Sequence, residues 1–566
     1  MKTISLILFL LISIGCFGQE NYFTDPVKIP LLLSGSFAEL RSNHFHSGID
    51  IKTQGTVGIP VYAVANGYIS RIAVSPTGYG NALYINHTNG TTTVYGHLLH
   101  FSPAIDKYVK DKQYEQKSFR VDLQIPQYLF PVKQNDEIAK SGNSGSSGGP
   151  HLHFEIRDTK TEEPLNPLKY NFPVKDSIAP KIFSLLVVPL SDDSHVNFST
   201  IQQSYPVVFY DGKYHLKNNP VIPAWGKIGV AVQTNDYFNG TYNKCGINLL
   251  RMTLDDETQF MFRLNRFSFD NSRYINSHIV YDEYVTSKRR FQKTWLEPGN
   301  KLPIYNHNGS RGIISPEPDK TQQVEIELQD TYGNTSVIAF SMKGSFKNVQ
   351  INSNESQRLF KYNKENQFNT DDIEMLIPKN ALYKDFNFFY SKKNAPAEFY
   401  SEYHIVHNNT VPLHKNIDLR VKAKNLPREL EPKAILANID TTTGEFYAAG
   451  GKFKNGWVET KTSNFGTYAV VVDTIAPTII PLSIKANALT ETNRIRFKIQ
   501  DDLAGIETIE GILDGKWALF EYDPKNNRIT HYFDKTRFEF NRQHHLKLTV
   551  TDYRGNSAVY EVNFWK

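Results

Sequence analysis

Polar and apolar residues alternate in two short stretches near the N-terminus of the chain. Residues 151–157 read His-Leu-His-Phe-Glu-Ile-Arg, and residues 48–52 read Gly-Ile-Asp-Ile-Lys. A period of two predicts β-strands, because successive side chains of a strand point to opposite faces. His151 and His153 should therefore share one face of a strand, and Asp50 should lie on the polar face of a second strand.

These two strands carry side chains that bind metal ions. His46 falls in the turn before the strand of Asp50, so two neighbouring strands can present His46, Asp50 and His153 to one ion. Zn²⁺ accepts imidazole nitrogen and carboxylate oxygen, and a catalytic zinc keeps three protein ligands and leaves a fourth position for water. Of the 17 histidines in the chain, a large share falls before residue 160: His44, His46, His87, His97, His100, His151 and His153.

Short alternating runs also fill most of the remaining chain, and Asn-Gly and Asp-Gly turns separate them. Aromatic residues, which favour strands, are abundant, with 31 Tyr and 36 Phe. The pattern predicts an all-β fold that begins with an antiparallel sheet. One connection differs, because residues 103–130 form a long insertion with an expected short helix at 105–114. This insertion is either a lid or wall of a substrate groove, or a surface loop without a role in the site.

The length of 566 residues indicates about three to five domains, because one hydrophobic core cannot serve so long a chain. An internal repeat helps to divide it. The sequence D-[ST]-I-A-P at 176–180 recurs at 473–477, and the D-x-x-G-N turn at 330–334 recurs at 552–556. We therefore expect an N-terminal domain at 28–172, immunoglobulin-like β-sandwiches at 173–345 and 473–566, and a further β-sandwich at 346–472.

Several aspartates stand near the joints between these expected modules: Asp236, Asp330, Asp501, Asp502 and Asp552. Carboxylates at such positions accept hydrogen bonds from the backbone amides of turns, and this is the preferred interpretation. Binding of Ca²⁺, which takes oxygen ligands, is the alternative.

The first residues have the pattern of an export signal. Lys2 precedes an apolar stretch at 4–14 and small residues suited to cleavage, so residues 1–18 are expected to be a signal peptide. A lipoprotein acylated at Cys16 is the alternative. We expect no transmembrane segment after signal removal, and a location in the periplasm, in the cell envelope or outside the cell. Removal of Cys16 leaves Cys245 alone, so no intrachain disulfide is expected.

The charge of the chain bears on its partners. The formal net charge is +5, which is small for this length, and the basic residues form no block. This balance gives no support for nucleic-acid binding and only a faint preference for anionic cell walls.

Three motifs and a glycine-rich run carry a resemblance to a known family. They are H-x-x-x-D at 46–50, Y-x-H-L at 95–98, G-P-H-L-H-F-E at 149–155 and the run at 141–149. From residue 28 to 168 the chain resembles the lysostaphin and LytM type of zinc endopeptidase, which cuts peptide cross-links in bacterial peptidoglycan. The resemblance implies one zinc ion per chain, with peptidoglycan as the substrate. It makes His46, Asp50 and His153 the zinc ligands, and His97 and His151 the two catalytic histidines that do not bind zinc.

The implied reaction is metal-assisted amide hydrolysis. Zinc polarises the scissile carbonyl and lowers the pKa of its bound water from about 15.7 toward about 7. We expect His151 to be the general base, because imidazole titrates near the working pH. His97 would hydrogen-bond the developing oxyanion or the leaving amine, and the two histidines can exchange these roles. Glu155 is either a partner that fixes an imidazole tautomer or a surface carboxylate.

Other candidates for chemistry are weaker. The sequence at 145–149 matches G-x-S-x-G, but a nucleophile elbow needs a strand before it and a helix after it, whereas a proline and a strand follow here. The chain contains no H-E-x-x-H motif. His44 can share the face of His46, and His87 and His100 are expected to be solvated. We expect the glycines of the run to let a loop pass close to a substrate backbone.

Three functions follow from these observations. The first is an exported zinc endopeptidase that acts on peptidoglycan, and the intact set of five site residues favours it. The second is a regulator of the LytM type that does not cleave but recruits or activates another cell-wall hydrolase. The third is an adhesive or structural surface protein in which the β-sandwiches carry the main role.

Overall fold

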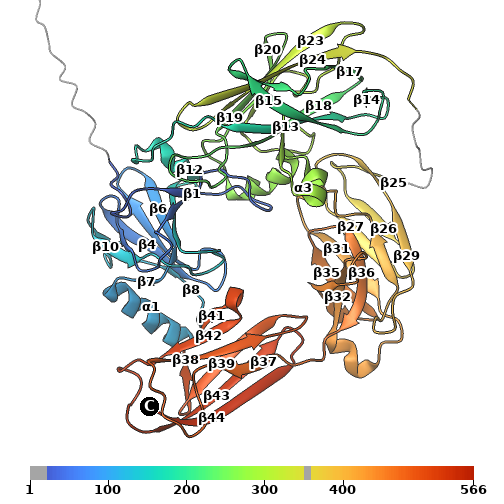
Figure 1. Ribbon diagram of the computed structural model, residues 1–566. Helices are drawn as coiled ribbons and strands as arrows, with labels where there is room; N and C mark the ends of the chain where they lie inside the picture. The colour runs from blue at the N-terminus through green and yellow to red at the C-terminus, as the bar shows by residue number, and fades with distance from the viewer. Residues whose placement is uncertain (1–21, 350–357) are drawn as a thin grey trace, which may run out of the picture.

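The computed structural model describes residues 22–349 and 358–566 (Figure 1). The expected signal peptide at 1–18, with Cys16, lies outside these residues. Strands dominate the described chain and helices are few, which confirms the all-β fold class. None of the helices in the two described ranges has the length and apolar character needed to cross a membrane.

Strands between residues 33 and 165 form two antiparallel sheets. The larger sheet has the order β1 (Leu33–Gly35), β2 (Ile49–Lys52), β11 (His151–Asp158), β6 (Thr91–Leu98), β5 (Asn81–His87), β4 (Gly67–Val74), β8 (Val121–Gln124), with β12 (Pro164–Leu165) beside β11 and β9 (Pro131–Val132) beside β4. The smaller sheet has the order β3 (Pro60–Tyr62), β10 (Glu137–Lys140), β7 (His100–Phe101). Leu152, Phe154 and Ile156 of β11 are fully buried in the core, so the alternate residues face the opposite side, as the period of two predicts.

The insertion after His97 contains helix α1 (Pro103–Gln116), which is longer at both ends than the expected helix. Pro103 occupies the first turn, where its missing N–H leaves no hydrogen bond unmade. Lys117 ends the helix in the left-handed conformation. Ile105 and Val109 are buried in the core and attach one side of the helix to the sheets. A short 3-10 helix, η1 (Pro167–Lys169), closes this region.

Strands between residues 181 and 344 form one twelve-stranded sheet around a second core. Its order is β21 (Phe291–Lys293), β18 (Ile228–Asn235), β13 (Lys181–Pro189), β15 (Gln203–Tyr210), β16 (Lys213–Leu216), β24 (Thr335–Gly344), β23 (Thr321–Gln329), β19 (Leu249–Leu254), β20 (Glu257–Arg263), β22 (Tyr305–His307), with β17 (Val221–Trp225) pairing β24 and β14 (His195–Val196). Three short helices lie on its connections: η2 (Phe269–Tyr274), α2 (Ile275–His278) and α3 (Tyr281–Ser287).

The two C-terminal groups of strands each contain paired sheets. Residues 358–472 form β25 (Arg358–Phe360) with β28 (Phe386–Phe388); β26 (Asn366–Asn369), β27 (Ile373–Ile377), β31 (Ile417–Lys422), β35 (Trp457–Thr462) and β34 (Lys452–Lys454); and β29 (Tyr390–Lys393), β30 (Tyr403–Val406), β36 (Gly466–Val472), β32 (Ala434–Ile439) and β33 (Phe446–Gly450), with η3 (Arg428–Lys433). Residues 478–565 form β37 (Thr478–Pro481), β38 (Arg494–Gln500), β42 (Arg528–Tyr532) and β41 (Glu521–Asp523), facing β40 (Lys516–Ala518), β39 (Ile506–Leu513), β43 (Gln543–Asp552) and β44 (Ser557–Trp565), with η4 (Pro524–Asn526). The domain boundaries named above stay a prediction.

One N-terminal segment packs into the second core rather than into its own. Phe37 and Phe45 are buried against Phe267, with ring centroids 5.4 and 5.6 Å away. The backbone amide of Phe45 also donates to Ser272 Oγ at 2.9 Å. The turn that carries His46 is therefore held by the second core and by helix η2, which follows β20.

The last group of strands meets the insertion helix, so the chain forms a ring (Figure 1). Tyr114 of α1 packs edge-on against Trp517, with ring centroids 5.2 Å apart, and Arg537 forms an ion pair with Asp111. Lys525 donates to the carbonyl oxygen of Gly145 at 3.1 Å, within the glycine-rich loop. Residues far apart in the sequence thus lie side by side near the N-terminal sheets.

Candidate metal centre

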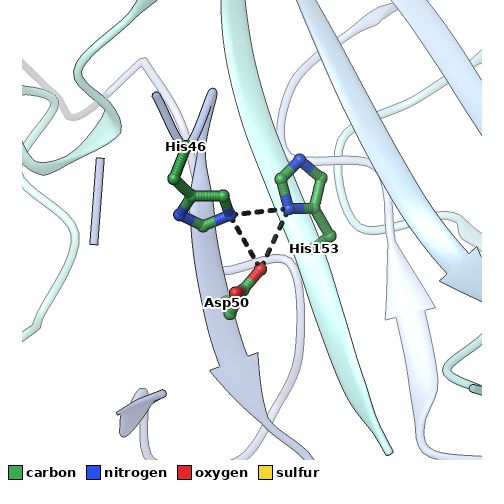
Figure 2. Close-up of side chains that lie close together, drawn as sticks. All are labelled: His46, Asp50 and His153. Atoms are coloured by element: carbon green, nitrogen blue, oxygen red, sulfur yellow. Dashed lines mark hydrogen bonds and ion pairs between the residues drawn. The ribbon is translucent and has the colours of Figure 1, made fainter. Parts of the chain in front are cut away.

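Three side chains converge where β2 and β11 pair. His46 comes from the turn before β2, Asp50 from β2 and His153 from β11, and the strand register places His153 directly opposite Asp50. Asp50 Oδ1 lies 3.0 Å from His46 Nε2 and 2.9 Å from His153 Nδ1, and the two nitrogens are 3.1 Å apart (Figure 2). All three residues are buried. The sequence-predicted ligands thus form one compact cluster.

In each of the two imidazoles, the outer nitrogen, which points away from Asp50, donates a hydrogen bond. His46 Nδ1 donates to the carbonyl oxygen of Ser36 at 2.8 Å, and His153 Nε2 donates to Glu155 Oε1 at 2.7 Å. In a neutral imidazole the other nitrogen then carries a lone pair. His46 Nε2 and His153 Nδ1 therefore direct two lone pairs and Asp50 a carboxylate oxygen at one point, an arrangement that a cation stabilises.

The spacing of these atoms fits zinc. Two ligands bound tetrahedrally at about 2.0–2.1 Å are about 3.3 Å apart, close to the separations in this cluster. Without a cation, the pKa values of His153 and Asp50 are shifted instead. Burial of His153 disfavours its charged form, but its hydrogen bonds to Asp50 and Glu155 outweigh burial and raise its pKa to about 9. Burial likewise opposes ionisation of Asp50, yet the three histidines around it hold its pKa well below the usual value.

Glu155 is the centre of a buried network behind the cluster. Its side chain is fully buried and accepts from His153, from Ser47 Oγ at 2.5 Å, from Tyr79 Oη at 2.6 Å and from Arg157 Nε at 2.6 Å. Burial alone would raise the pKa of Glu155, but Arg157 and His153 lower it, so the carboxylate stays ionised. Of the two expected roles for Glu155, the structure supports the partner that fixes the tautomer of His153.

His97 and His151 lie beside the cluster, with ring centroids 4.8 Å apart. His97 Nδ1 donates to the carbonyl oxygen of Ser144, and His151 Nδ1 to that of Gly149, both at 2.9 Å. Each imidazole therefore keeps its lone pair on Nε2. His151 Nε2 lies 3.4 Å from Asp50 Oδ1, at the edge of the cluster.

His97 occupies a strained position. Its φ is +59°, in the left-handed region, and the β5–β6 register shifts between Asn81 and Leu83, opposite it. Such bulges redirect a side chain, and strain of this kind gathers at functional sites. Burial, together with the neighbouring His153 and His151, lowers the pKa of His97 to about 3, so its imidazole is neutral.

The glycine-rich loop packs against the protein's own backbone. A Cβ at Gly142 would lie 2.4 Å from Leu99 N, and one at Gly145 would lie 2.3 Å from Gly80 N. These two glycines serve the fold rather than a substrate, contrary to expectation, whereas Gly148 and Gly149 face open space. The loop joins β10 to β11 without a helix, so the G-x-S-x-G sequence forms no nucleophile elbow.

The remaining N-terminal histidines lie apart from the cluster. His44 is exposed and contacts the carbonyl oxygen of Ser42. The expectation for His87 was wrong, because it is buried between the carbonyl oxygen of Asn66 and Thr93 Oγ1. Both ring nitrogens of His87 have hydrogen-bond partners inside the protein. A polar side chain on a strand can therefore be buried rather than exposed to solvent. His100 is exposed, as expected.

Sequence reasoning missed several residues that position the site. Arg157 continues the alternating face of β11, so the period of two offered a signal for it. Tyr79, Ser47 and Ser36 gave none, because only the folded chain brings them together. Arg41 was also missed: its Nη2 lies 3.1 Å from Asp50 Oδ2, the carboxylate oxygen that does not face the histidines.

Fold and site together define the class: a β-sheet domain of the lysostaphin and LytM type, which confirms the resemblance seen in the motifs. The chain belongs to peptidase family M23, which matches residues 44–114. A second family, the Zu5-like domain, matches residues 357–473.

Individual relatives are similar to the N-terminal part of the chain. The DD-carboxypeptidase/endopeptidase Mpg of Neisseria meningitidis is 33% identical over 138 residues, which are 24% of this chain and 25% of Mpg. Lipoprotein NlpD of Yersinia enterocolitica is 30% identical over 20% of this chain and 93% of its own length. The catalytic domain of lysostaphin from Staphylococcus simulans aligns with 25% of this chain and 91% of its own, at 21% identity and a TM-score of 0.19. The chain spans about a quarter of the length of the Mpg relatives.

Proposed function

We propose that the protein is a zinc-dependent endopeptidase that hydrolyses peptide cross-links or stem peptides of bacterial peptidoglycan outside the cytoplasm. The observation that carries this proposal is the convergence of His46 Nε2, Asp50 Oδ1 and His153 Nδ1 within 3.1 Å of one another. The outer nitrogen of each imidazole is already satisfied, so both histidines are oriented for a metal ion before it binds.

The chain's own residues supply the remaining parts of a hydrolytic site. Zinc, when bound by His46, Asp50 and His153, polarises a carbonyl group and acidifies water. His151 has its Nδ1 proton directed at Gly149, so Nε2, on the side of Asp50, is free to accept a proton. His97 is neutral and oriented by Ser144, and it is suited to hydrogen-bond a substrate oxygen or leaving amine. We assign His151 as general base and His97 as the stabilising partner.

The names of relatives support the substrate. The N-terminal region is similar to the peptidoglycan DD-endopeptidase ShyB of Vibrio cholerae, with 28% identity over 27% of this chain, and to Mpg. These names favour a peptide bond of the peptidoglycan cross-link. A substrate of that kind agrees with the expected signal peptide at 1–18, because peptidoglycan lies outside the cytoplasmic membrane.

The test is digestion of purified peptidoglycan with zinc-loaded full-length protein, followed by muropeptide analysis. We expect new peptide products with the wild type and none with His46→Ala or after chelation. An Asp122→Asn variant is the control, since Asp122 lies on the far strand β8, where it forms an ion pair with Arg71 of β4. A wild type that binds zinc but leaves the muropeptide profile unchanged would support the alternative, a regulator that does not cleave.

A further inference from the structure

A second cluster of acidic side chains lies in the region of the twelve-stranded sheet, away from the peptidase site. Asp176 precedes β13, Asp236 follows β18, and Asp330 follows β23. One carboxylate oxygen from each lies within 4.8 Å of the other two. Asp236 and Asp330 are almost completely buried, with 1% and 2% of their surface exposed.

Nothing in the described part of the chain neutralises this cluster. Among residues 22–349 and 358–566, no lysine, arginine or histidine acts on the carboxyl groups of Asp176 and Asp236, whose charged neighbours are the other aspartates of the cluster. Asp236 Oδ1 and Asp176 Oδ2 are buried oxygens without a hydrogen-bond partner. Buried carboxylates without partners are costly, and buried charges in proteins are normally paired or coordinate metals.

Asp330, in contrast, has hydrogen-bond donors for both carboxylate oxygens, and these donors fix its orientation in the cluster. Its Oδ1 accepts from the backbone amides of Tyr332, Gly333 and Asn334 at 2.7–2.9 Å, and Oδ2 accepts from Asn334 Nδ2 at 2.6 Å. Three amides and an amide side chain hold it rigidly. Asp236 is held less completely, because its Oδ1 is buried without a donor, and so its burial calls for another partner.

The C-terminal sandwich repeats this arrangement. Asp473, Asp501 and Asp552 also bring one oxygen each within 4.8 Å of the others. Asp552, like Asp330, accepts from the amides of its own turn and from the side chain of Asn556, which follows it by four residues. Asp501 Oδ1 is a buried oxygen without a partner, as Asp236 Oδ1 is, although the Asp501 residue as a whole is only half-buried.

The equivalence follows the topology as well as the sequence repeat. Asp176 and Asp473 stand in the segments before β13 and β37. Asp236 and Asp501 directly follow β18 and β38, which are the strands that pair with β13 and β37. The same three positions of two modules therefore carry the same cluster, although the intervening loops differ in length.

We infer that each cluster is a binding site for a divalent cation of the calcium type, which sits at the start of its module. Oxygen is the only donor in both clusters, and hard cations such as Ca²⁺ prefer carboxylate oxygens. Two oxygens bound to one Ca²⁺ at about 2.3–2.6 Å can be at most about 5 Å apart, and the separations meet this limit. Burial, with Asp176 and Asp330 nearby, raises the pKa of Asp236 to about 9, because a further negative charge among buried carboxylates is unfavourable without a cation.

The second site lies at a joint between modules. Lys433 Nζ donates to Asn556 Oδ1 at 2.5 Å, and Arg554 Nη1 donates to the carbonyl oxygen of Gly451 at 2.9 Å, so the turn after Asp552 contacts the preceding module. A cation at Asp473, Asp501 and Asp552 would stiffen this joint. The same C-terminal module contacts helix α1, so the cation would help to keep the ring closed.

The inference is tested by calorimetric titration of Ca²⁺ into full-length protein preloaded with one equivalent of zinc. We expect two Ca²⁺ ions per wild-type chain. Asp236→Asn should bind one, Asp501→Asn should bind one, and the double variant none. The matched control is Asp502→Asn: Asp502 adjoins Asp501 but is exposed and outside the cluster, so this variant should bind two.

Wild-type protein that binds no Ca²⁺ at 10 mM would overturn the inference. Stoichiometry that stays at two in the double variant would overturn it as well. Because wild-type titration alone decides the first outcome, misfolding of a variant cannot hide the result. Zinc content of one per chain in Asp236→Asn separates this test from the proposed peptidase activity.

Discussion

Replacing Glu155 by Gln keeps the shape of the side chain but removes the charge at the centre of the network behind the metal centre. Glu155 is fully buried and Arg157 is 5% exposed, and Glu155 Oε2 accepts from Arg157 Nε at 2.6 Å. Removing one partner of such a buried pair costs about 3–5 kcal/mol. Loss of a carboxylate behind a metal-bound histidine weakens metal affinity by about 10–100-fold, or about 1.4–2.7 kcal/mol.

Chelator competition measures the zinc affinity, and hydrogen exchange of β11 measures the local opening free energy. The matched control is Glu162→Gln, because Glu162 also contacts Arg157, at 3.3 Å, but its side chain is 58% exposed. An exposed pair of this kind is worth at most about 1 kcal/mol. Equal zinc affinity in Glu155→Gln and the wild type would contradict a role of Glu155 in metal binding. A loss of zinc affinity of the same size in Glu162→Gln would show that removal of any negative charge near Arg157, buried or exposed, causes the effect.

Three further predictions address other parts of the molecule. Phe267→Ala, which removes a fully buried ring and costs about 3–5 kcal/mol, should also raise the dissociation constant for zinc by loosening the turn of His46; unchanged affinity in chelator competition would contradict this. His151→Ala should retain one zinc by metal analysis but lose about 10²–10⁴-fold in kcat, and near-normal turnover would remove it from the mechanism. Burial raises the pKa of Glu521 from 4.5 to about 7, so the protonated form favours the packed C-terminal module. The stabilisation of the folded module by protonated Glu521 is complete below pH 4.5 and disappears as the pH rises through 7. Hydrogen exchange in helix α1 should therefore increase over this range relative to Glu521→Gln measured at the same pH, and parallel profiles would contradict it.

Strand periodicity predicted much of the candidate site. Alternation in β11 and β2 fixed which side chains share a face, and neighbouring strands then needed only the correct register to place His153 opposite Asp50. The family resemblance supplied His97, whose position depends on a bulge that no alternation reveals. The same alternation also places Arg157 on the face of His153 and Glu155.

Long-range packing was not readable from the sequence. Periodicity tells which face of a strand is apolar, but not which other part of the chain covers it. The packing of Phe37 and Phe45 into the second core and the contact of Tyr114 with Trp517 both join segments that are far apart in the sequence. The insertion was therefore expected as a lid or a loop, whereas its helix contacts the last module.

The residues around His46, Asp50 and His153 are proposed to catalyse hydrolysis of a peptidoglycan peptide bond. The most direct measurement is mass spectrometry of a purified cross-linked muropeptide after incubation with zinc-loaded full-length protein in ¹⁸O-labelled water. We expect cleavage with one ¹⁸O atom in the new carboxyl terminus for the wild type, and no cleavage for Asp50→Ala. An intact substrate with the wild type, or equal cleavage by Asp50→Ala, would contradict it.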